Sequence, residues 1–210
     1  MEFDIFIVSG FSGSGKGTIL KKLLSLHPEL ELIKSYTTRQ KRNDADFYSF
    51  VTQEEFMSLR RENYFLECNQ YSGEWYGTPI RAVQSCVNKG KIAVIEIDSN
   101  GFRQIMESSL ARKYRVLSVF IVADADTIVK RLLNRNTENL EKILLRSNSS
   151  LDECEWIVYY DLVLPNYDLD ESVTIFEKAI LTGTIPKMTF NFNVEEYKHR
   201  MKHLIYLLSD

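Results

Sequence analysis

The chain has 210 residues, enough for one domain or for one domain with a small insert, and 44% of them are hydrophobic. Its 29 acidic residues outnumber its 26 basic ones, and the resulting net charge of −3 argues against nucleic acid as a main partner. Three cysteines without metal-ligand spacing, no apolar run of the ~20 residues that cross a membrane, and no secretory pattern at the N-terminus predict a reduced, cytoplasmic protein with no membrane partner.

The first predicted elements are an apolar strand over about 4–8, a glycine-rich turn, and a helix from about Lys16 to Leu26. The turn contains Gly10-x4-Gly15-Lys16, the spacing of a phosphate-binding loop. Glycines let the main-chain N–H groups surround an anion, and the lysine adds a full positive charge. An ordinary glycine-rich turn is the alternative, but the strand before it, the helix after it and the lysine in register favour binding of a nucleoside triphosphate.

The next region interrupts the regular alternation of strands and helices. Its predicted elements are strands over about 32–36, 48–51 and 64–67, and a helix over 53–61. Thr52 and Glu55 form the capping box that opens this helix. Gly73 and Gly77 indicate a loop after the last strand. We therefore expect residues 35–78 to form a lobe inserted into the core.

Beyond this lobe, strands and helices alternate again. The predicted elements are helix 79–88, strand 92–97, a helix to about 109, strand 116–122, helix 126–134, a mobile helical excursion over 136–149, strand 162–164 and helix 169–181. Apolar strands that alternate with helices predict an α/β fold with a parallel, doubly wound core sheet. The core is expected over 1–34 and 79–181, with a lid at about 135–150.

Arginines after the loop helix are candidates for binding a phosphate group, and carboxylates at the end of a core strand are candidates for binding another part of a ligand. Arg39 and Arg42 follow hydroxyl residues that begin at Ser35, and two guanidinium forks would neutralise a dianionic phosphate. A solvated basic loop is the alternative. Glu96 and Asp98 end a predicted core strand, the place where open α/β sheets bind ligands.

A second arginine set, Arg131, Arg135 and Arg146, follows the third core strand. These arginines are expected either to close over phosphates as a lid or, for the first two, to pair with Asp126 or Glu138 on the surface. The three histidines all lie outside the candidate site, which argues against histidine-based acid–base chemistry. Phosphoryl transfer to an anionic phosphate needs in-line positioning, Mg²⁺ and positive charge, and this set of residues suits that reaction.

Taken together, these motifs resemble the guanylate kinase family over residues 4 to about 180. The pieces that carry the resemblance are Ser9-Gly10-x-Ser12-Gly13-x-Gly15-Lys16, Ser35-Tyr36-Thr37-Thr38-Arg39-x-x-Arg42, Tyr48-x-Phe50-Val51, Phe65-Leu66-Glu67, Gly73-x-x-Tyr76-Gly77-Thr78, Ile95-Glu96-Ile97-Asp98, Arg131-Leu132-x-x-Arg135-x-Thr137, Ile143-x-x-Arg146, and Tyr160-Asp161-Leu162-Val163 followed by Asn166. The resemblance implies a three-layer P-loop fold with a small mixed GMP-binding lobe and a helical lid. It also implies transfer of the γ-phosphoryl group of ATP to GMP or dGMP, a step of purine nucleotide metabolism.

The resemblance also implies roles by motif position. The residues expected to bind GMP are Ser35, Arg39, Arg42, Tyr48, Glu67, Tyr76, Gly77, Thr78, Glu96 and Asp98. Those expected to bind ATP are Ser12, Gly13, Ser14, Gly15, Lys16, Gly17, Thr18, Arg131, Arg135 and Asn166. The expected catalytic residues are Lys16, Arg39, Arg135 and Arg146. Mg²⁺ is expected to be held mainly by ATP and water, with no direct protein ligand apart from Thr18 as a candidate.

The chain departs from the family pattern at three places. Gly17 replaces the usual serine after the loop lysine, the segment 43–47 is shorter than usual, and Asn136 and Tyr167 replace a glycine and an aspartate. Two alternative functions follow: a catalytically inactive, guanylate-kinase-like module that binds proteins, and a related kinase with a different phosphorylated acceptor. Retention of the loop glycines and lysine disfavours the first, and the set of guanine-binding residues disfavours the second.

Residues 182–210 form an extension beyond the resemblance. Asn193 is the predicted cap of a helix, and its apolar residues recur at spacings of three and four: Val194, Tyr197, Met201, Leu204 and Leu208. We expect this seam to pack back onto the domain, or else to form a homodimer contact.

Overall fold

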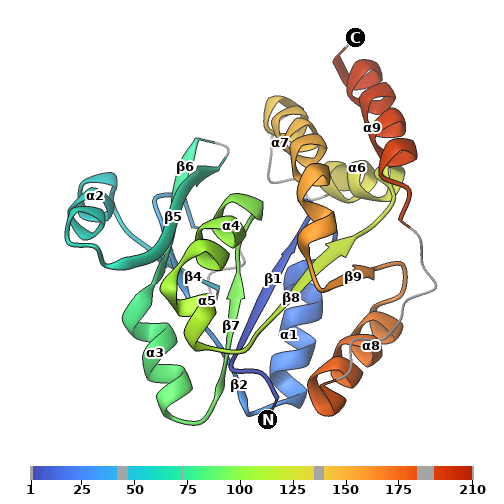
Figure 1. Cartoon of the computed structure of the whole chain (residues 1–210). Helices are drawn as coiled ribbons and strands as arrows, with labels where there is room; N and C mark the ends of the chain where they lie inside the picture. The colour runs from blue at the N-terminus through green and yellow to red at the C-terminus, as the bar shows by residue number, and fades with distance from the viewer. Residues whose placement is uncertain (1, 42–46, 72, 135–139, 184–191, 210) are drawn as a thin grey trace. The chain divides into compact units, whose positions relative to one another are not determined.

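The computed structural model describes residues 2–41, 47–71, 73–134, 140–183 and 192–209, which form an α/β fold with two β-sheets (Figure 1). Two compact units make up the chain: residues 1–8 with 20–118, and residues 9–19 with 119–210. None of the described helices is long and apolar enough to cross a membrane.

The helices and strands follow the predicted order closely. The strands are β1 (Ile5–Gly10), β2 (Leu30–Leu32), β3 (Ser35–Thr37), β4 (Tyr48–Phe50), β5 (Phe65–Tyr71), β6 (Glu74–Pro79), β7 (Ile92–Glu96), β8 (Val116–Val122) and β9 (Leu162–Pro165). The helices are α1 (Lys16–Leu26), α2 (Gln53–Arg61), α3 (Ile80–Asn88), α4 (Ser99–Glu107), α5 (Ser109–Lys113), α6 (Ala125–Asn134), α7 (Leu140–Glu153), the 3-10 helix η2 (Cys154–Tyr159), α8 (Leu169–Thr182) and α9 (Val194–Ser209).

The larger sheet has the strand order β2-β7-β1-β8-β9, and its β1–β7, β2–β7 and β8–β9 pairs are parallel. Every residue of β1 is buried, because a parallel strand in this fold is covered on both faces. The parallel core sheet predicted from the apolar strands is therefore confirmed. The carboxyl end of β1 leads directly into the glycine-rich turn, which lies in the second unit.

The smaller sheet is mixed, with the order β4-β3-β6-β5. β3 runs parallel to β4 and antiparallel to β6, and β5 and β6 form an antiparallel hairpin. Helix α2 packs against this sheet through Phe56, whose ring stacks on that of Phe65 with the ring centres 4.6 Å apart. The predicted capping box is present: the Thr52 hydroxyl accepts from the Glu55 main-chain N–H, and the Glu55 carboxylate accepts from that of Thr52.

Two sequence-based expectations in this region are wrong. The single strand expected over 32–36 is two strands, because β2 pairs with β7 while β3 turns into the other sheet. The loop expected around Gly77 is β6. Gly77 marks a close approach there, since a Cβ at this position would lie 2.8 Å from the Phe65 ring. The glycine therefore leaves space for an aromatic ring within a strand.

Some element boundaries also differ from those expected. Pro79 ends β6 and precedes the helix α3 instead of forming its first residue. The single helix expected from about 99 to 109 divides into α4 and α5 at Ser108, whose hydroxyl caps α5. The excursion expected over 136–149 contains the regular helix α7; its residues up to 139 lie outside the described part of the chain.

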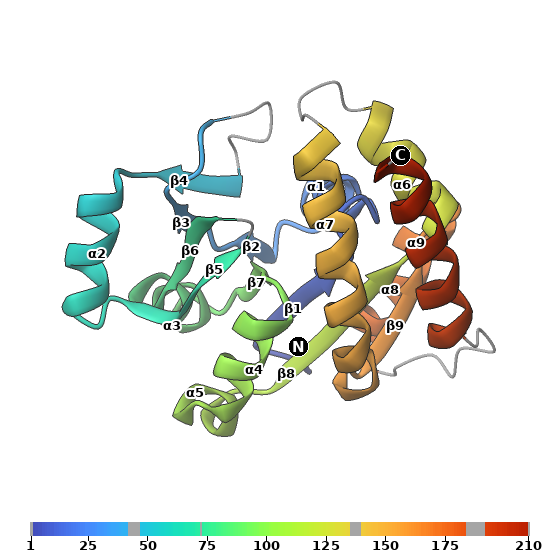
Figure 2. The same cartoon turned by 90° about the horizontal axis from the view of Figure 1, so that it is seen from above.

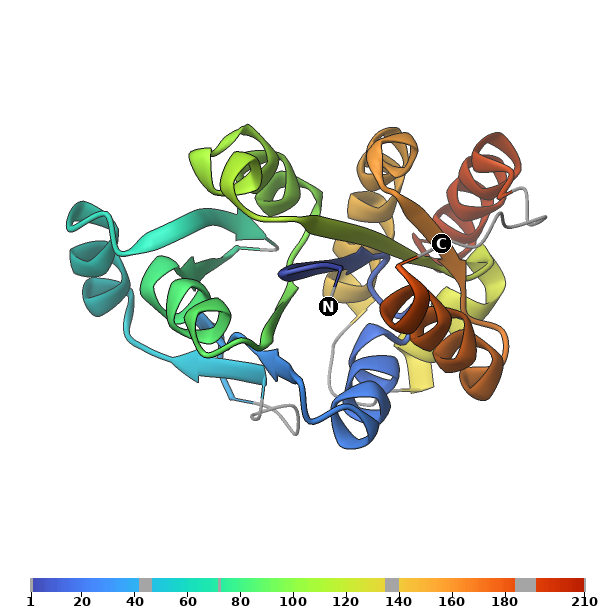
Figure 3. The same ribbon diagram turned by 60° about the horizontal axis from the view of Figure 1, so that its bottom comes forward.

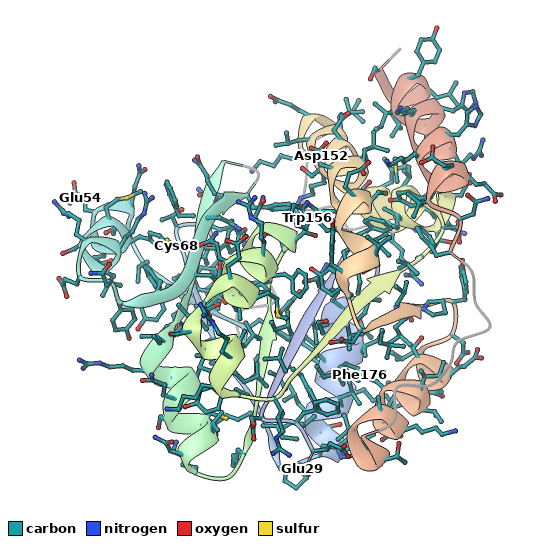
Figure 4. The ribbon with its side chains drawn as sticks, viewed as in Figure 1. Glu29, Glu54, Cys68, Asp152, Trp156 and Phe176 are labelled. Carbon is teal, nitrogen blue, oxygen red and sulfur yellow. The ribbon has the colours of Figure 1, made fainter. Side chains whose placement is uncertain are left out.

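In the second unit, α6, α7 and α9 lie side by side (Figures 1 and 2). The expected cap of α9 is present, because the Asn193 side chain accepts from the Glu196 main-chain N–H over 3.1 Å. Tyr197 and Met201 are buried, so the C-terminal helix packs back onto its own unit, as expected. Helix α8 packs on β9 (Figure 3), and its buried Phe176 points into the interior (Figure 4).

Candidate active site

The glycine-rich turn forms a tight loop at the start of α1. Gly10, Gly13 and Gly15 all have positive φ, which residues with a side chain rarely adopt. Gly10 also approaches β8 closely, because a Cβ would lie 2.2 Å from the carbonyl oxygen of Ile121. The Lys16 ammonium donates to the carbonyl oxygens of Gly10 and Phe11 over 2.6 and 3.1 Å. The loop thus carries a lysine and a helix N-terminus, both of which attract an anion.

Arg131 and Asn166 bind the main chain of this loop. One guanidinium nitrogen of Arg131 donates to the carbonyls of Gly13 and Ser14, and the other donates to the carbonyl of Asn166. The Asn166 side chain donates to the Ser14 carbonyl over 2.6 Å. The structure therefore brings both residues to the loop. In this arrangement they support its conformation, while a direct contact with a nucleotide remains a prediction.

Arg146 of α7 also reaches the loop. Its Nη1 donates to the hydroxyl of Ser12 over 2.9 Å. Arg135 lies outside the described residues. Asp126, one of the two surface partners considered for Arg131, pairs with Arg200 of α9 through both carboxylate oxygens, and the other, Glu138, lies outside the described residues. We name the loop residues Gly10–Thr18 with Lys16, Arg131, Arg146 and Asn166 the loop cluster; all of it belongs to the second unit.

The first unit contains a second cluster of polar side chains, the Glu67 cluster, which consists of the buried residues Ser35, Glu67 and Thr78 and the half-buried residues Asn69 and Asp98. The Thr78 hydroxyl donates to the Glu67 carboxylate over 2.6 Å and lies 3.5 Å from the Ser35 hydroxyl. Glu67 is 4% exposed and Thr78 is fully buried. A carboxylate is rarely buried to this degree unless it is paired or serves a ligand.

The Glu67 carboxyl group has a strongly perturbed pKa. Burial raises the pKa from 4.5 to about 7, and the negative charge of Asp98 adds to this rise, whereas the hydrogen bond from Thr78 opposes it. Helix α4 approaches the same carboxylate, because a Cβ at Gly101 would lie 2.8 Å from Glu67 Oε2. The group is therefore poised near neutrality, where a ligand with suitable donors can shift its protonation.

Asp98 caps α4 and is tied to β5. A single carboxylate oxygen accepts from the Gly101 main-chain N–H over 2.9 Å and from the Asn69 side chain over 2.7 Å. The Gln104 side-chain amide, one turn further along α4, pairs with both the N–H and the carbonyl of Cys68. Sequence reasoning missed Asn69, Gly101 and Gln104. The one available signal was a glycine in the first turn of a helix, where it indicates a close approach.

Two aromatic rings lie beside Arg39, which belongs to the first unit. Arg39 is buried, and its guanidinium carbon lies 4.9 Å from the ring centre of Tyr48 and 5.7 Å from that of Phe50. The Tyr48 ring in turn lies 6.0 Å from Tyr76. Cation–π contacts of this kind hold a guanidinium in place while it keeps its charge. The structure thus brings Arg39, Tyr48 and Tyr76 together as expected, whereas Arg42 lies outside the described residues.

The remaining predicted residues lie at the edges of these clusters. Glu96 ends β7 and is half-buried, and Gly77 lies in β6 between Tyr76 and Thr78. Thr18 is exposed, and a Cβ at Gly17 would have no atom within 4 Å. Within the described ranges, no group of three or more His, Cys, Asp or Glu side chains is arranged to hold a metal ion.

Comparison with known proteins matches most of the chain to one family. The sequence profile described as guanylate kinase matches residues 3–182, almost the whole chain. The chain belongs to the guanylate kinase family. It is 36% identical over 181 residues to a guanylate kinase of Prochlorococcus marinus subsp. pastoris, an alignment that covers 84% of this chain and 96% of the relative.

Other guanylate kinases extend the match in sequence and in structure. One from Clostridium perfringens is 31% identical over 203 residues, covering 95% of this chain and 92% of its own length. The crystal structure of the guanylate kinase from Anaplasma phagocytophilum superposes with a TM-score of 0.65 at 25% identity and covers 87% of both chains. The α/β fold with two sheets is thus that of a guanylate kinase.

The perturbed Glu67 carboxyl predicts a pH-dependent stability. Because its pKa is raised on folding, the protonated form favours the folded state, and this contribution is lost as pH rises from about 4.5 to 7. A rise in pKa from 4.5 to about 7 corresponds to roughly 3 kcal/mol. Glu67→Gln cannot ionise, so its free energy of unfolding relative to the wild type should increase by that order between pH 4.5 and 8. Urea denaturation of both proteins across this range measures it, and a difference independent of pH would contradict the argument.

Proposed function

We propose that this chain transfers the γ-phosphoryl group of ATP to GMP or dGMP, giving ADP and GDP or dGDP. The observation that carries the proposal is the buried carboxylate of Glu67 with the hydroxyls of Thr78 and Ser35 beside it. Guanine presents two adjacent donors, N1–H and the exocyclic amino group, which one carboxylate accepts together. Adenine has no such pair on that edge and would leave the buried carboxylate without those two donors, which is strongly unfavourable.

Burial of Glu67 assists this selection. In the absence of a ligand, the pKa of Glu67 lies at about 7, so a proton competes for the carboxylate. Two donors from guanine favour the ionised form, and GMP binding is therefore accompanied by proton release near neutral pH. Asp98 is held by Asn69 and by the first turn of α4, and we assign its other oxygen to the guanine amino group.

Arg39, with Arg42, Tyr48 and Tyr76, is proposed to bind the phosphate of GMP. The aromatic rings around Arg39 hold its guanidinium, which offers several N–H donors in a planar fork that matches phosphate oxygens. The two tyrosine hydroxyls supply neutral donors. Because the acceptor is already an anion, no general base is required, and the positive charge offsets repulsion between the two phosphate groups.

The loop cluster is proposed to bind ATP. Main-chain N–H groups at the start of α1 receive the β- and γ-phosphates, and Lys16 exchanges the carbonyls of Gly10 and Phe11 for phosphate oxygens. Arg146, with Arg135, is proposed to approach the transferred group from a lid at about 135–150, which is part of the proposed core (1–34 and 79–181); residues 35–78 are the proposed GMP lobe. Arg131 and Asn166 keep the loop in its binding conformation.

Mg²⁺ is the proposed cofactor of ATP. It would bridge phosphate oxygens and offset their charge during transfer. The chain offers few ligands of its own: Gly17 has no hydroxyl, and Thr18 is the nearby candidate. We therefore propose that ATP oxygens and water supply most of the coordination.

The two other functions lose support in the structure. A protein-binding module without catalysis has no need for the loop cluster, whose lysine and arginines converge on the phosphate loop. A different phosphorylated acceptor has no need for a buried acid beside two hydroxyls. We also propose the cytoplasm as its location, since Cys68, Cys86 and Cys154 are free thiols.

The function is tested by measuring ADP formation with GMP, dGMP, AMP and CMP in turn. GMP and dGMP should support turnover at least about 100-fold above AMP, which is the discrimination expected when a buried carboxylate loses the two donors of guanine. Equal turnover with all four nucleotides would contradict the proposal.

Two variants separate the halves of the site. Glu67→Gln places an amide donor against the donors of guanine, so it should raise the KM for GMP about ten-fold or more while ATP binding is retained. Lys16→Ala should reduce kcat by about 100-fold or more with the fold unchanged, because it removes the charge that stabilises the transferred group. Calorimetry with ATP and with GMP, together with circular dichroism, checks both.

Gly17 allows a direct test of metal handling. Since a Cβ there meets no atom within 4 Å, Gly17→Ser adds a hydroxyl without a clash. We expect it to lower the Mg²⁺ concentration needed for half-maximal ATP binding in calorimetry, by about two- to ten-fold for one added ligand. Gly17→Ala is the matched control, because it adds the Cβ alone. The same response from both variants would refute a role for the hydroxyl.

A homodimer through α9 is a separate proposal. Tyr197 and Met201 of the helix are buried in its own unit, but Tyr206 and Leu207 near its end are exposed. If they form a dimer contact, the double substitution Tyr206→Lys with Leu207→Lys should halve the mass in solution measured by light scattering. A wild-type protein that is already monomeric would end this proposal.

A further inference from the structure

Phe11 of the phosphate loop lies in an aromatic cluster that includes the C-terminal helix. Its ring is fully buried and stacks on Tyr197 of α9, with ring centres 4.4 Å apart and planes 5° from parallel. On another side it meets Phe120 of β8 edge-on at 5.1 Å, and Phe192 lies 5.9 Å away. A residue of the donor-binding loop is thus packed against a helix that lies beyond residues 3–182, the part matched to the family.

The main chain at Phe11 sets the geometry of the loop. Its carbonyl oxygen accepts from the Lys16 ammonium over 3.1 Å and from the Ser14 main-chain N–H over 3.0 Å. The position of the Phe11 ring therefore determines where this carbonyl lies and where the lysine side chain is directed. Loss of the stacked Tyr197 ring would therefore loosen the Phe11 carbonyl and the Lys16 side chain.

The same tyrosine also contacts the helix that carries Arg146. The Tyr197 hydroxyl donates to the Ser150 hydroxyl of α7 over 3.0 Å, and burial raises the pKa of Tyr197, so it remains protonated. About one turn earlier in α7, Arg146 donates to Ser12 in the loop. Tyr197 is thus in contact with both elements that are proposed to surround the donor phosphates.

Ion pairs fix α9 in this place. Arg200 donates to both carboxylate oxygens of Asp126 in α6, over 2.8 and 2.5 Å, and Lys198 pairs with Glu155. Met201, one turn after Tyr197, is fully buried. Figure 2 shows α9 lying alongside α6 and α7. The stacking contact therefore comes from a docked helix.

We propose that Tyr197 is a positioning residue for phosphoryl transfer, which acts by holding the phosphate loop at Phe11 in its ATP-binding conformation. The inference rests on the proposed function, and it gives the C-terminal helix a part in binding the donor. The acceptor half contains no residue of this contact, because Ser35, Glu67 and Arg39 belong to the other unit. A selective effect on ATP is therefore expected.

The test is the pair of variants Tyr197→Ala and Tyr197→Phe. Loss of the ring should raise the KM for ATP, and the dissociation constant of ATP in calorimetry, by about five-fold, in line with the strength of a buried aromatic pair. The KM for GMP should stay within about two-fold. Tyr197→Phe keeps the stacked ring without the hydroxyl and should restore ATP binding to near the wild-type value.

Met201→Ala is the matched control, because it removes a buried side chain from the same helix. It should lower the melting temperature while leaving the KM for ATP unchanged. The inference is overturned if Tyr197→Ala binds ATP normally, if both KM values rise together, or if Met201→Ala weakens ATP binding equally. Should Tyr197→Ala fail to fold, Tyr197→Leu, which retains apolar volume without a flat ring, must show the same selective effect. Wild-type protein without GMP-dependent ADP formation would instead refute the proposed function.

Discussion

A phosphate loop must keep its main-chain N–H groups for the ligand, so its carbonyl oxygens need other partners. In this chain charged and amide side chains supply them. Lys16 donates to the carbonyls of Gly10 and Phe11, while Arg131 and Asn166 donate to those around Ser14. The hydrogen bonds from Lys16 and Arg131 direct positive charge toward the loop as well as fixing its shape, whereas Asn166 contributes a neutral amide. The strength of anion binding and the rigidity of the loop therefore have the same physical origin, and a residue that holds the loop also contributes to its electrostatic field.

The acceptor half depends on the opposite arrangement, a negative charge removed from water. Glu67 is buried beside Thr78, and Asp98 lies close enough to raise its pKa further. Such a group destabilises the empty protein, and that energy is recovered when two donors of a base reach it. In the proposed function, selectivity arises because a base without those donors leaves the unfavourable burial of Glu67 in place. By the same proposal, the two clusters recognise substrate by contrasting means: positive charge at the loop cluster recognises phosphate, and the buried acid Glu67 recognises guanine.

Much of this was predictable from the sequence because the relevant signals are local. The loop glycines with Lys16, the apolar parallel strands and the capping box of α2 each depend on neighbours within a few residues. Contacts distant in sequence were not predictable. The β5–β6 hairpin could not be predicted, because a glycine usually indicates a loop. Gly77 instead lies within a strand, where it leaves space for the Phe65 ring.

The same limit applies to the supporting residues of the site. Asn69 and Gln104 connect β5 to α4 across about thirty residues or more, and no spacing rule joins them. The stack of Tyr197 on Phe11 spans nearly the whole chain. The periodicity of the last helix correctly predicted a buried face, but it gave no indication that the phosphate loop would be the surface covered.

Gly101 illustrates a different kind of constraint. A glycine within a helix lowers helical stability by about 1 kcal/mol relative to alanine, so helix stability alone favours alanine at this position. A Cβ at this position would lie 2.8 Å from Oε2 of the buried Glu67 carboxylate, so any side chain there would displace that carboxylate. Position 101 is therefore a point where selection for the ligand and selection for the helix act in opposite directions. Laboratory evolution toward greater thermal stability would encounter this conflict early. In the proposed function, variants that keep a substitution at Gly101 would no longer use guanine nucleotides as substrates.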